Sequence, residues 1–448
     1  MSTREGNLEA PTRHPLDWLN PSFYDEQECL HELERIFDIC HGCRRCVSLC
    51  QSFPTLFDLV DESSTGEVAS VDKQDFWKVV DQCYICDLCY MTKCPYVPPH
   101  PWNLDFPHTM LRAKAIQFKQ GKVSRANVLL ASTDVHGKLA GIPIVVQVAN
   151  TANKTTPVRA LLENTLGIDR HAWVPDLASK KFRSAAPHAG VKQAPDGQRT
   201  PGRVAIFSTC YINYNEPKIG LDLLKVLDHN GVAYELVDKE QCCGMPKLEI
   251  GDLDAVARAK EVNIPALARY ARAGYAILTG VPSCTLMFKQ EIPLMYPDDA
   301  DVKAVQDAIW DPFEYLVARH KDGLLKTDFK QSLGKVSYQI PCHSRVQNMG
   351  RKTEELFKLI AKTVEVQLTT VERCSGHAGT YGVKKAHHAD AMKIGKAVFK
   401  AMDAPQPDYI SSDCPLGGHH IAQGIAEQGS SHPRLEHPLS LLRIAYGL

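Results

Sequence analysis

Short apolar runs alternate with amphipathic stretches along the C-terminal half of the chain. The runs VAIFSTC (204–210) and VSYQIPC (336–342) each end in a cysteine, and stretches with a helical period follow them, GLDLLKVLDHN and GRKTEELFKLIAK. Strands that alternate with helices favour parallel α/β units, in which ligands bind at the carboxyl ends of the strands. The cysteines that close these runs are therefore candidate ligands.

The same half of the chain is a tandem duplication. Three pairs of cysteines repeat at a nearly constant offset, Cys210 with Cys342 and Cys242 with Cys374 at 132 residues, and Cys284 with Cys414 at 130. Gly244 and Gly376 are also 132 residues apart, so the match extends beyond cysteine. We expect two cysteine-rich α/β repeats of the same fold, at 204–325 and 326–448.

The N-terminal part has a different cysteine pattern. The stretches CHGCRRCVSLC and CYICDLCYMTKCP supply eight cysteines, Cys40, Cys43, Cys46, Cys50, Cys83, Cys86, Cys89 and Cys94. Three thiolates at two-residue intervals fold around one [4Fe–4S] cluster, and the fourth ligand typically comes from the other motif. We assign Cys40, Cys43, Cys46 and Cys94 to cluster 1 and Cys83, Cys86, Cys89 and Cys50 to cluster 2.

These motifs depart slightly from the bacterial ferredoxin pattern. Four residues separate Cys89 from Cys94, and Gln51 stands where a proline is usual, but neither change removes a ligand. Structural zinc is disfavoured because zinc sites take four ligands in pairs. The stretch DKQDFWKVVDQ between the motifs is amphipathic, which favours a helical ferredoxin-like module at 29–120 over the compact β-rich form.

The remaining segments complete the expected domain organisation. Residues 1–28 form an N-terminal extension, and 121–203 form a helical connector that ends in a linker rich in Ala, Pro, Gly and basic residues. Cys29 lies alone on an expected helix and is interpreted as a buried structural thiol.

Composition narrows the classes of function. The chain has 51 basic and 52 acidic residues, so no overall charge attracts nucleic acid. The N-terminus resembles neither a secretory signal nor an anchor, which favours a cytoplasmic protein whose 16 cysteines bind metal rather than form disulfides. The apolar run at 140–149 is too short to cross a bilayer and is expected to be buried, with contact to a membrane surface as the alternative.

The whole pattern resembles a known family. The phrases TCYINYNEPKIGLDLLKVL, CCGMPK, AGTYGVKK and EHPLSLL are similar to the iron–sulfur subunit of anaerobic glycerol-3-phosphate dehydrogenase, a relative of heterodisulfide reductase. The phrases CDLCYMTKCPYVPPHPWNLDFPH and ERCSGHAG look closer to a stand-alone, heterodisulfide-reductase-related branch associated with rubrerythrin. The resemblance implies multidomain α+β proteins with Cys-Cys-Gly domains.

The resemblance also implies that each repeat supplies a Cys, a Cys-Cys-Gly and a closing Cys-x2-Cys to a metal centre. The first repeat has Val281 at one closing position but keeps four thiolates, Cys210, Cys242, Cys243 and Cys284, enough for a third iron–sulfur centre. The second repeat has Ser375 and Gly417 at two of the ligand positions and keeps three, Cys342, Cys374 and Cys414.

Histidines surround the reduced ligand set of the second repeat. His377 follows Cys374, and the alternative ligands are His343, His419 and His420. Imidazole binds iron and zinc, so a metal or atypical cluster at this repeat and an empty pocket remain alternatives. His387 and His388 have charged neighbours on an expected helix and are interpreted as exposed.

These motifs favour an electron-transfer protein or subunit that connects two clusters to a redox centre in the repeats. A Gly-x-Gly-x-x-Gly after a strand and a Walker loop are both absent from the sequence, so flavin chemistry belongs to a partner. The candidate partners are a flavoprotein dehydrogenase, a rubrerythrin-like peroxide reductase and, at the inner face of the cell membrane, the quinone pool. The alternatives are a disulfide or thiol reductase acting at the first-repeat centre and a redox sensor or scaffold.

Overall fold

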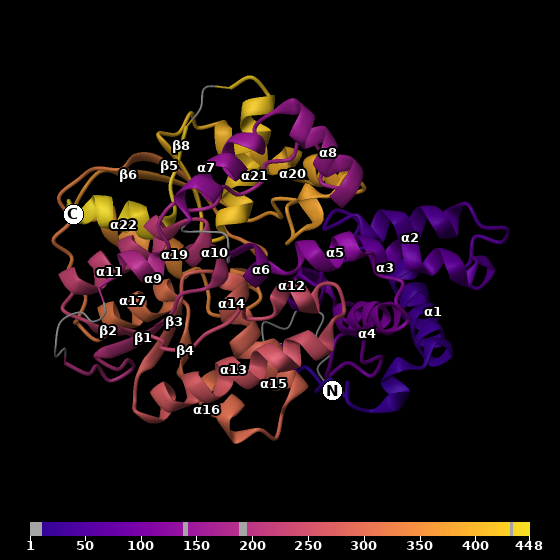
Figure 1. Cartoon of the computed structure of the whole chain (residues 1–448). Helices are drawn as coiled ribbons and strands as arrows, with labels where there is room; N and C mark the ends of the chain where they lie inside the picture. The colour runs from indigo at the N-terminus through magenta and orange to yellow at the C-terminus, as the bar shows by residue number, and fades with distance from the viewer. Residues whose placement is uncertain (1–10, 138–141, 188–194, 431–432) are drawn as a thin grey trace.

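The computed structural model describes residues 11–137, 142–187, 195–430 and 433–448. Two four-stranded parallel sheets of the same topology form its C-terminal part (Figure 1). The first has the order β2-β1-β3-β4, with β1 (Arg203–Phe207), β2 (Ala233–Leu236), β3 (Ala276–Thr279) and β4 (Ile309–Trp310). The second has the order β6-β5-β7-β8, with β5 (Gly334–Gln339), β6 (Val366–Val371), β7 (Tyr409–Ser412) and β8 (Arg434–Leu435).

The helices of the two repeats follow the strands in matching order. The first repeat contains α10 (Cys210–Tyr214), α11 (Pro217–His229), α12 (Met245–Leu248), α13 (Leu253–Arg272), α14 (Pro282–Leu286), η5 (Met287–Glu291), α15 (Ile292–Met295), α16 (Ala300–Ala308) and α17 (Pro312–Lys321). The second contains α18 (Cys342–Arg345), α19 (Lys352–Ile360), η6 (Tyr381–Val383), α20 (His388–Asp403), α21 (Pro415–Glu427) and α22 (Pro438–Tyr446). The duplication predicted from cysteine spacing is thus a duplication of parallel α/β units.

Burial explains why these segments form their elements. The last four residues of β1 and all four of β3 are buried, as expected for central strands of a parallel sheet covered on both faces. The helix α11 buries Ile219, Leu223 and Leu227, which recur at helical spacing on one face. That face packs against α22 of the second repeat, so the two repeats share one core.

The edge strands β4 and β8 were not predicted. Each has two residues, and each pairs with one neighbour through two residue pairs. A run this short carries no alternation of apolar and polar residues, so its position depends on the adjacent strand.

The described N-terminal half is helical. Its longer elements are α1 (Glu26–Cys43), α2 (Ser52–Asp61), α3 (Phe76–Gln82) and α4 (Phe106–Lys119), which lie together on one side of the molecule (Figure 1). The short ones are η1 (Pro21–Tyr24), η2 (Val68–Ser70), η3 (Lys73–Asp75) and η4 (Cys89–Lys93). The connector contains α5 (Arg125–Leu130), α6 (Thr133–Gly137), α7 (Pro143–Ala152), α8 (Thr156–Leu166) and α9 (Phe182–Ala185). Part of the expected linker, 188–194, lies outside the described residues.

The expectation that the apolar run at 140–149 is buried is wrong for its described part. Among the described side chains of α7, only Val146 is buried, whereas Ile144 and Val148 are 78% and 63% exposed. Hydrophobic composition alone does not show which face of a short helix has a partner. Within the described residues, no helix is both long enough and apolar enough to cross a bilayer.

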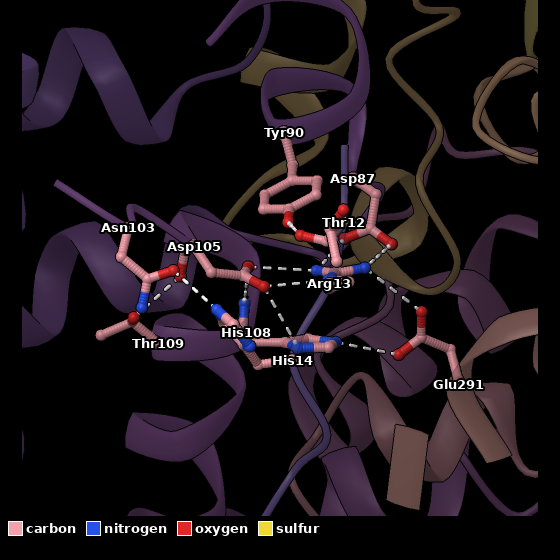
Figure 2. Close-up of polar contacts among 10 residues, drawn as sticks. All are labelled: Thr12, Arg13, His14, Asp87, Tyr90, Asn103, Asp105, His108, Thr109 and Glu291. Atoms are coloured by element: carbon pink, nitrogen blue, oxygen red, sulfur yellow. Dashed lines mark hydrogen bonds and ion pairs between the residues drawn. The ribbon is translucent and has the colours of Figure 1, made fainter. Parts of the chain in front are cut away.

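A buried ion cluster joins the N-terminal segment to the rest of the fold (Figure 2). The guanidinium of Arg13 donates to both carboxylate oxygens of Asp87, at 2.7 and 3.0 Å, and to Asp105 at 2.9 Å. Its third partner is Glu291 in η5, at 3.5 Å, and Glu291 also contacts His108 at 3.2 Å. Burial alone would raise the pKa of Asp105, but the positive charge of Arg13 opposes it, and with the other contacts of this carboxylate the pKa is lowered to about 2.

Replacing Arg13 by Met should destabilise the protein by about 3–5 kcal/mol, because two buried carboxylates and one partly buried carboxylate would lose one shared cation. Chemical denaturation under anaerobic conditions measures the loss. The matched control is Arg35→Met, whose pair with Glu32 is exposed and should contribute under about 1 kcal/mol. Equal stability of the two variants would contradict this prediction.

Candidate iron–sulfur centres

The cysteines assigned to cluster 1 surround one small cavity of about 20 Å³. Cys40 and Cys43 lie in the last turn of α1, and Cys46 and Cys94 complete the lining. Burial raises the pKa of Cys40, and the nearby Cys94, Cys46 and Cys43 raise it further. The structure therefore brings these four thiols together as the spacing predicted.

A second cavity, of about 100 Å³, lies between the N-terminal helices and the second repeat, and we call it the central cavity. It is lined by the cysteines assigned to cluster 2, Cys50, Cys83, Cys86 and Cys89, and by those kept in the second repeat, Cys342, Cys374 and Cys414. Burial raises the pKa of Cys86, and Cys342, Cys374 and Cys50 raise it further. The expected sites of cluster 2 and of the second repeat are thus neighbours.

The loop from Cys83 to Cys89 has an uncommon backbone. Ile85 and Asp87 both have positive φ, at 51° and 60°, a region that a β-branched residue such as Ile rarely adopts. The strain is compatible with a tight loop that turns successive thiols to one side. The backbone N–H of Ile85 donates to Cys83 Sγ at 3.5 Å, and the ion pair with Arg13 fixes Asp87.

The chemistry of these thiols fits bound iron. All 16 cysteines are free. Buried thiols resist ionisation, and burial raises the pKa of Cys86 and Cys89 well above the ordinary value. Thiolates clustered in such places need cations among them, and iron supplies them in a cubane.

The first-repeat cysteines also converge. Cys210 begins α10, Cys242 and Cys243 occupy the turn before α12, and Cys284 lies in α14, all at the carboxyl ends of strands. Hydrogen bonds from the thiols of Cys210 and Cys243 lower the pKa of Cys242 well below its ordinary value. The turn requires glycine because Gly244 has a φ of 101°.

The second repeat repeats this geometry with two thiols missing. Gly376 has a φ of 89°, and a Cβ there would lie 2.2 Å from the carbonyl oxygen of Ala391. A Cβ at Gly417 would lie 3.3 Å from Ser375 Oγ and 3.6 Å from Cys414 Sγ. Both positions that lack a thiol therefore still face the remaining ligands.

Two of the four candidate histidines line the central cavity. His343 contacts Ser283 Oγ through Nδ1 at 2.9 Å, and its buried Nε2 has no hydrogen-bond partner among the described residues. Burial lowers the pKa of His377 to about 3, and the nearby His420 lowers it further, so its imidazole is neutral as a metal ligand requires.

The other two candidates are directed elsewhere. His419 pairs with Glu216 and stacks on Trp173 with ring centroids 4.0 Å apart, and it does not line the central cavity. His420 contacts His377 and Phe399 through its ring but likewise does not line the cavity. Among the described residues, no three Cys, His, Asp or Glu side chains are grouped closely enough to hold a single metal ion. A centre at the second repeat stays a prediction.

The interpretation of His387 and His388 as exposed is wrong. His388 is buried, with Nδ1 at 2.7 Å from the carbonyl oxygen of Gly382, and His387 stacks on Tyr381 at 4.5 Å. The fold places the start of α20 against η6, which charged neighbours in sequence do not reveal. Cys29, by contrast, is buried as predicted, and burial raises its pKa to about 12.

Comparison with known proteins gives the family. Residues 204–289 and 336–422 match the family model described as a cysteine-rich (CCG) domain. One of the subunits of the anaerobic glycerol-3-phosphate dehydrogenase of Escherichia coli K12 is 30% identical over 336 residues, which span 74% of this chain and 79% of that relative. The chain belongs to this cysteine-rich (CCG) family.

Two further relatives in the cysteine-rich family are more distant. One of the subunits of the fumarate reductase (CoM/CoB) of Methanothermobacter marburgensis is 27% identical over 313 residues, 69% of this chain and 60% of the relative. An uncharacterized iron–sulfur protein of Methanococcus maripaludis is 26% identical over 231 residues, 51% of this chain and 43% of the relative. The resemblance to the anaerobic glycerol-3-phosphate dehydrogenase subunit and to Cys-Cys-Gly domains is confirmed, and the relatives support iron–sulfur clusters in this member.

Sequence motifs missed a group of buried polar residues beside the central cavity. Glu249 and Tyr84 line it, and burial raises the pKa of Glu249 to about 7. Lys114 and Lys384 are buried beside Tyr84. No spacing rule finds this group, because its members come from segments far apart in sequence. Only Lys384 lay within a phrase that resembled the family, AGTYGVKK.

Proposed function

We propose that this protein is an electron-transfer subunit whose N-terminal part is a helical ferredoxin-like module. In it, Cys40, Cys43, Cys46 and Cys94 hold one [4Fe–4S] cluster, and Cys50, Cys83, Cys86 and Cys89 hold a second. Cys210, Cys242, Cys243 and Cys284 hold a third centre, and Cys342, Cys374 and Cys414 with His377 hold a metal or atypical cluster. When bound, these groups supply one-electron carriers.

One observation carries the proposal: cysteines of the N-terminal module and of the second repeat line the same cavity. Phe53 borders both this central cavity and the cavity of the cluster 1 cysteines. The two repeats are also close to each other. Burial raises the pKa of Tyr211, which follows Cys210 in the first repeat, and Cys414 of the second repeat is near enough to raise it further. These contacts support a single series of sites from the surface of the N-terminal module into the repeats.

The chain's own residues bind and insulate the carriers. Backbone N–H groups donate to sulfur at Cys374 and Cys414, from Gly376 at 3.3 Å and Gly417 at 3.4 Å, and such bonds raise the reduction potential of a ligated cluster. Apolar residues such as Phe53 exclude water from the space between sites.

Relatives that are subunits of a dehydrogenase and of a reductase support a partner enzyme for this chain. We propose a flavoprotein dehydrogenase as the partner, because the sequence encodes no flavin-binding motif of its own. The alternative partner is a rubrerythrin-like peroxide reductase, which the resemblance of the sequence motifs implies.

The exposed apolar residues of α7, with Leu161 of α8, support peripheral attachment at the inner face of the cell membrane, where quinone is accessible. The domain division at 28, 120, 203 and 325 belongs to the same proposal.

Freeze-quench EPR of the anaerobic chain, given one electron by deazaflavin photoreduction, tests the relay. Cluster signals of the N-terminal module should appear first, and the first-repeat signal should grow as they decay. In Cys86→Ser, growth of the first-repeat signal should slow at least about tenfold, whereas Cys29→Ser, which changes a buried thiol outside the sites, should leave it unchanged. An unchanged rate in Cys86→Ser would overturn the relay.

The alternative is a disulfide reductase at the first repeat. It is favoured by the low pKa of Cys242, because an ionised thiol attacks disulfides. The chain reduced with dithionite is mixed with a small aliphatic disulfide, and turnover that disappears in Cys242→Ser would favour the alternative. The relay predicts no turnover by the isolated chain.

A further inference from the structure

Two buried lysines lie against one tyrosine beside the central cavity. Lys384 Nζ donates to the hydroxyl of Tyr84 at 2.5 Å, and its ammonium is 5.2 Å from the centre of the ring. Lys114 Nζ is 4.7 Å from the centre of the same ring. Lys384, Lys114 and Tyr84 are 9%, 8% and 7% exposed, so both ammonium groups are largely removed from water.

The positive charge of this pair is only partly balanced. Asp81 and Glu249 act on both lysines through space, and neither ammonium forms a direct ion pair with a carboxylate among the described residues. Burial raises the pKa of Glu249 to about 7, so this carboxyl is only partly ionised at neutral pH. Burial also lowers the pKa of Lys384, to about 8, which leaves it mostly protonated. A net positive charge remains.

This charge lies beside the cluster 2 site, because both lysines contact Tyr84 and Tyr84 lines the central cavity. Tyr84 directly follows Cys83. Burial lowers the pKa of Lys114, and the nearby Cys83 opposes that shift, so the ammonium and this ligand thiol are close enough to interact. Four thiolates give an iron–sulfur cluster a net negative charge that grows on reduction, so a nearby buried cation stabilises the reduced state. The lysines are therefore placed to act on the electron affinity of this site.

We propose that Lys114 and Lys384 raise the reduction potential of the cluster held by Cys50, Cys83, Cys86 and Cys89. The inference rests on the proposed function, because it requires that cluster to be present. The cations make the site a better electron acceptor than it would be without them, which favours electron transfer from the N-terminal module into the repeats.

The origin of the charged residues gives the arrangement a second consequence. Tyr84 belongs to the N-terminal module, Lys114 to α4, Glu249 to the first repeat and Lys384 to the second repeat. The potential of one cluster therefore depends on the packing of all these units together. A cysteine module separated from the repeats would lose both Lys384 and Glu249.

An EPR-monitored redox titration of the full anaerobic chain tests the proposal, with the cluster 1 signal as an internal reference. In Lys114→Met and in Lys384→Met the equilibrium constant for reducing cluster 2 should fall about tenfold relative to that of cluster 1. This corresponds to a reduction potential lower by about 59 mV. Lys384→Arg, which keeps the charge, should stay near the wild type. Glu249→Gln, which removes a partial negative charge, should shift cluster 2 in the opposite direction. Lys122→Met, at a half-exposed lysine of the same region, is the matched control and should leave both signals unchanged.

The outcomes separate the two proposals. A wild-type protein with a single cubane signal would overturn the proposed function itself. Two signals with the same separation in the wild type and in the Lys→Met variants would overturn only the role of the lysines. If Lys114→Met loses cluster 2, the test rests on Lys384→Met and Glu249→Gln. Their shifts in the reduction potential of cluster 2 should have opposite signs, which a merely structural role of these residues would not produce.

Discussion

Replacing Cys83 by serine should remove about four iron atoms from each chain, the content of one [4Fe–4S] cluster. Cys83 lines the central cavity with Cys50, Cys86 and Cys89 and is buried there. Serine is a poor ligand for iron, and a cubane that loses one of four ligands in a buried site is not retained. The cluster 1 signal should survive, because its four thiols surround a separate cavity.

Iron analysis and EPR spin quantification of anaerobically purified protein measure this loss. Cys29→Ser is the matched control, since Cys29 is buried outside the cysteine sites and should leave the iron content unchanged. Iron near four atoms per wild-type chain, or no loss of iron in Cys83→Ser, would contradict the assignment of two N-terminal clusters.

Those parts of the fold and site that depend on local pattern or repeated spacing were predictable. The strands β1 and β5 overlap the apolar runs at 204–210 and 336–342 that end in a cysteine, and the offset of 132 residues predicted that both repeats share one topology. The grouping of the eight N-terminal cysteines followed from ligand spacing alone, and the thiols of each predicted group line a common cavity.

Properties set by contacts between distant segments were not predictable. Charged neighbours made His388 look exposed, but the turn at η6 covers it, and the apolar face of α7 looked buried although it has no covering element among the described residues. The proximity of the cluster 2 cysteines to the second repeat depends on how the N-terminal helices pack on the repeats. No pattern within either segment reports that packing, and the same holds for Lys114 and Lys384 around Tyr84.

Restoring the two missing thiols of the second repeat should create a complete iron–sulfur site. In the double variant Ser375→Cys with Gly417→Cys, iron should rise by about three to four atoms per chain, as five thiolates assemble a four-iron cluster in place of a single metal or an empty pocket. The geometry supports this gain, because a Cβ at Gly417 lies 3.6 Å from Cys414 Sγ and 3.3 Å from Ser375 Oγ. Contacts of that length need shifts of a few tenths of an ångström at most.

The matched control for this variant is Ser375→Ala with Gly417→Ala, which adds the same Cβ at Gly417 without any thiol and should gain no iron. The first-repeat signal should be the same in all three proteins, because its four thiols come from other strands. A new EPR signal that interacts magnetically with cluster 2 is expected, since both sites line the central cavity. If the double cysteine variant folds, keeps its other clusters and gains no iron, then the second-repeat cysteines do not share a metal site, and electrons must cross from cluster 2 to the first repeat without a carrier between them.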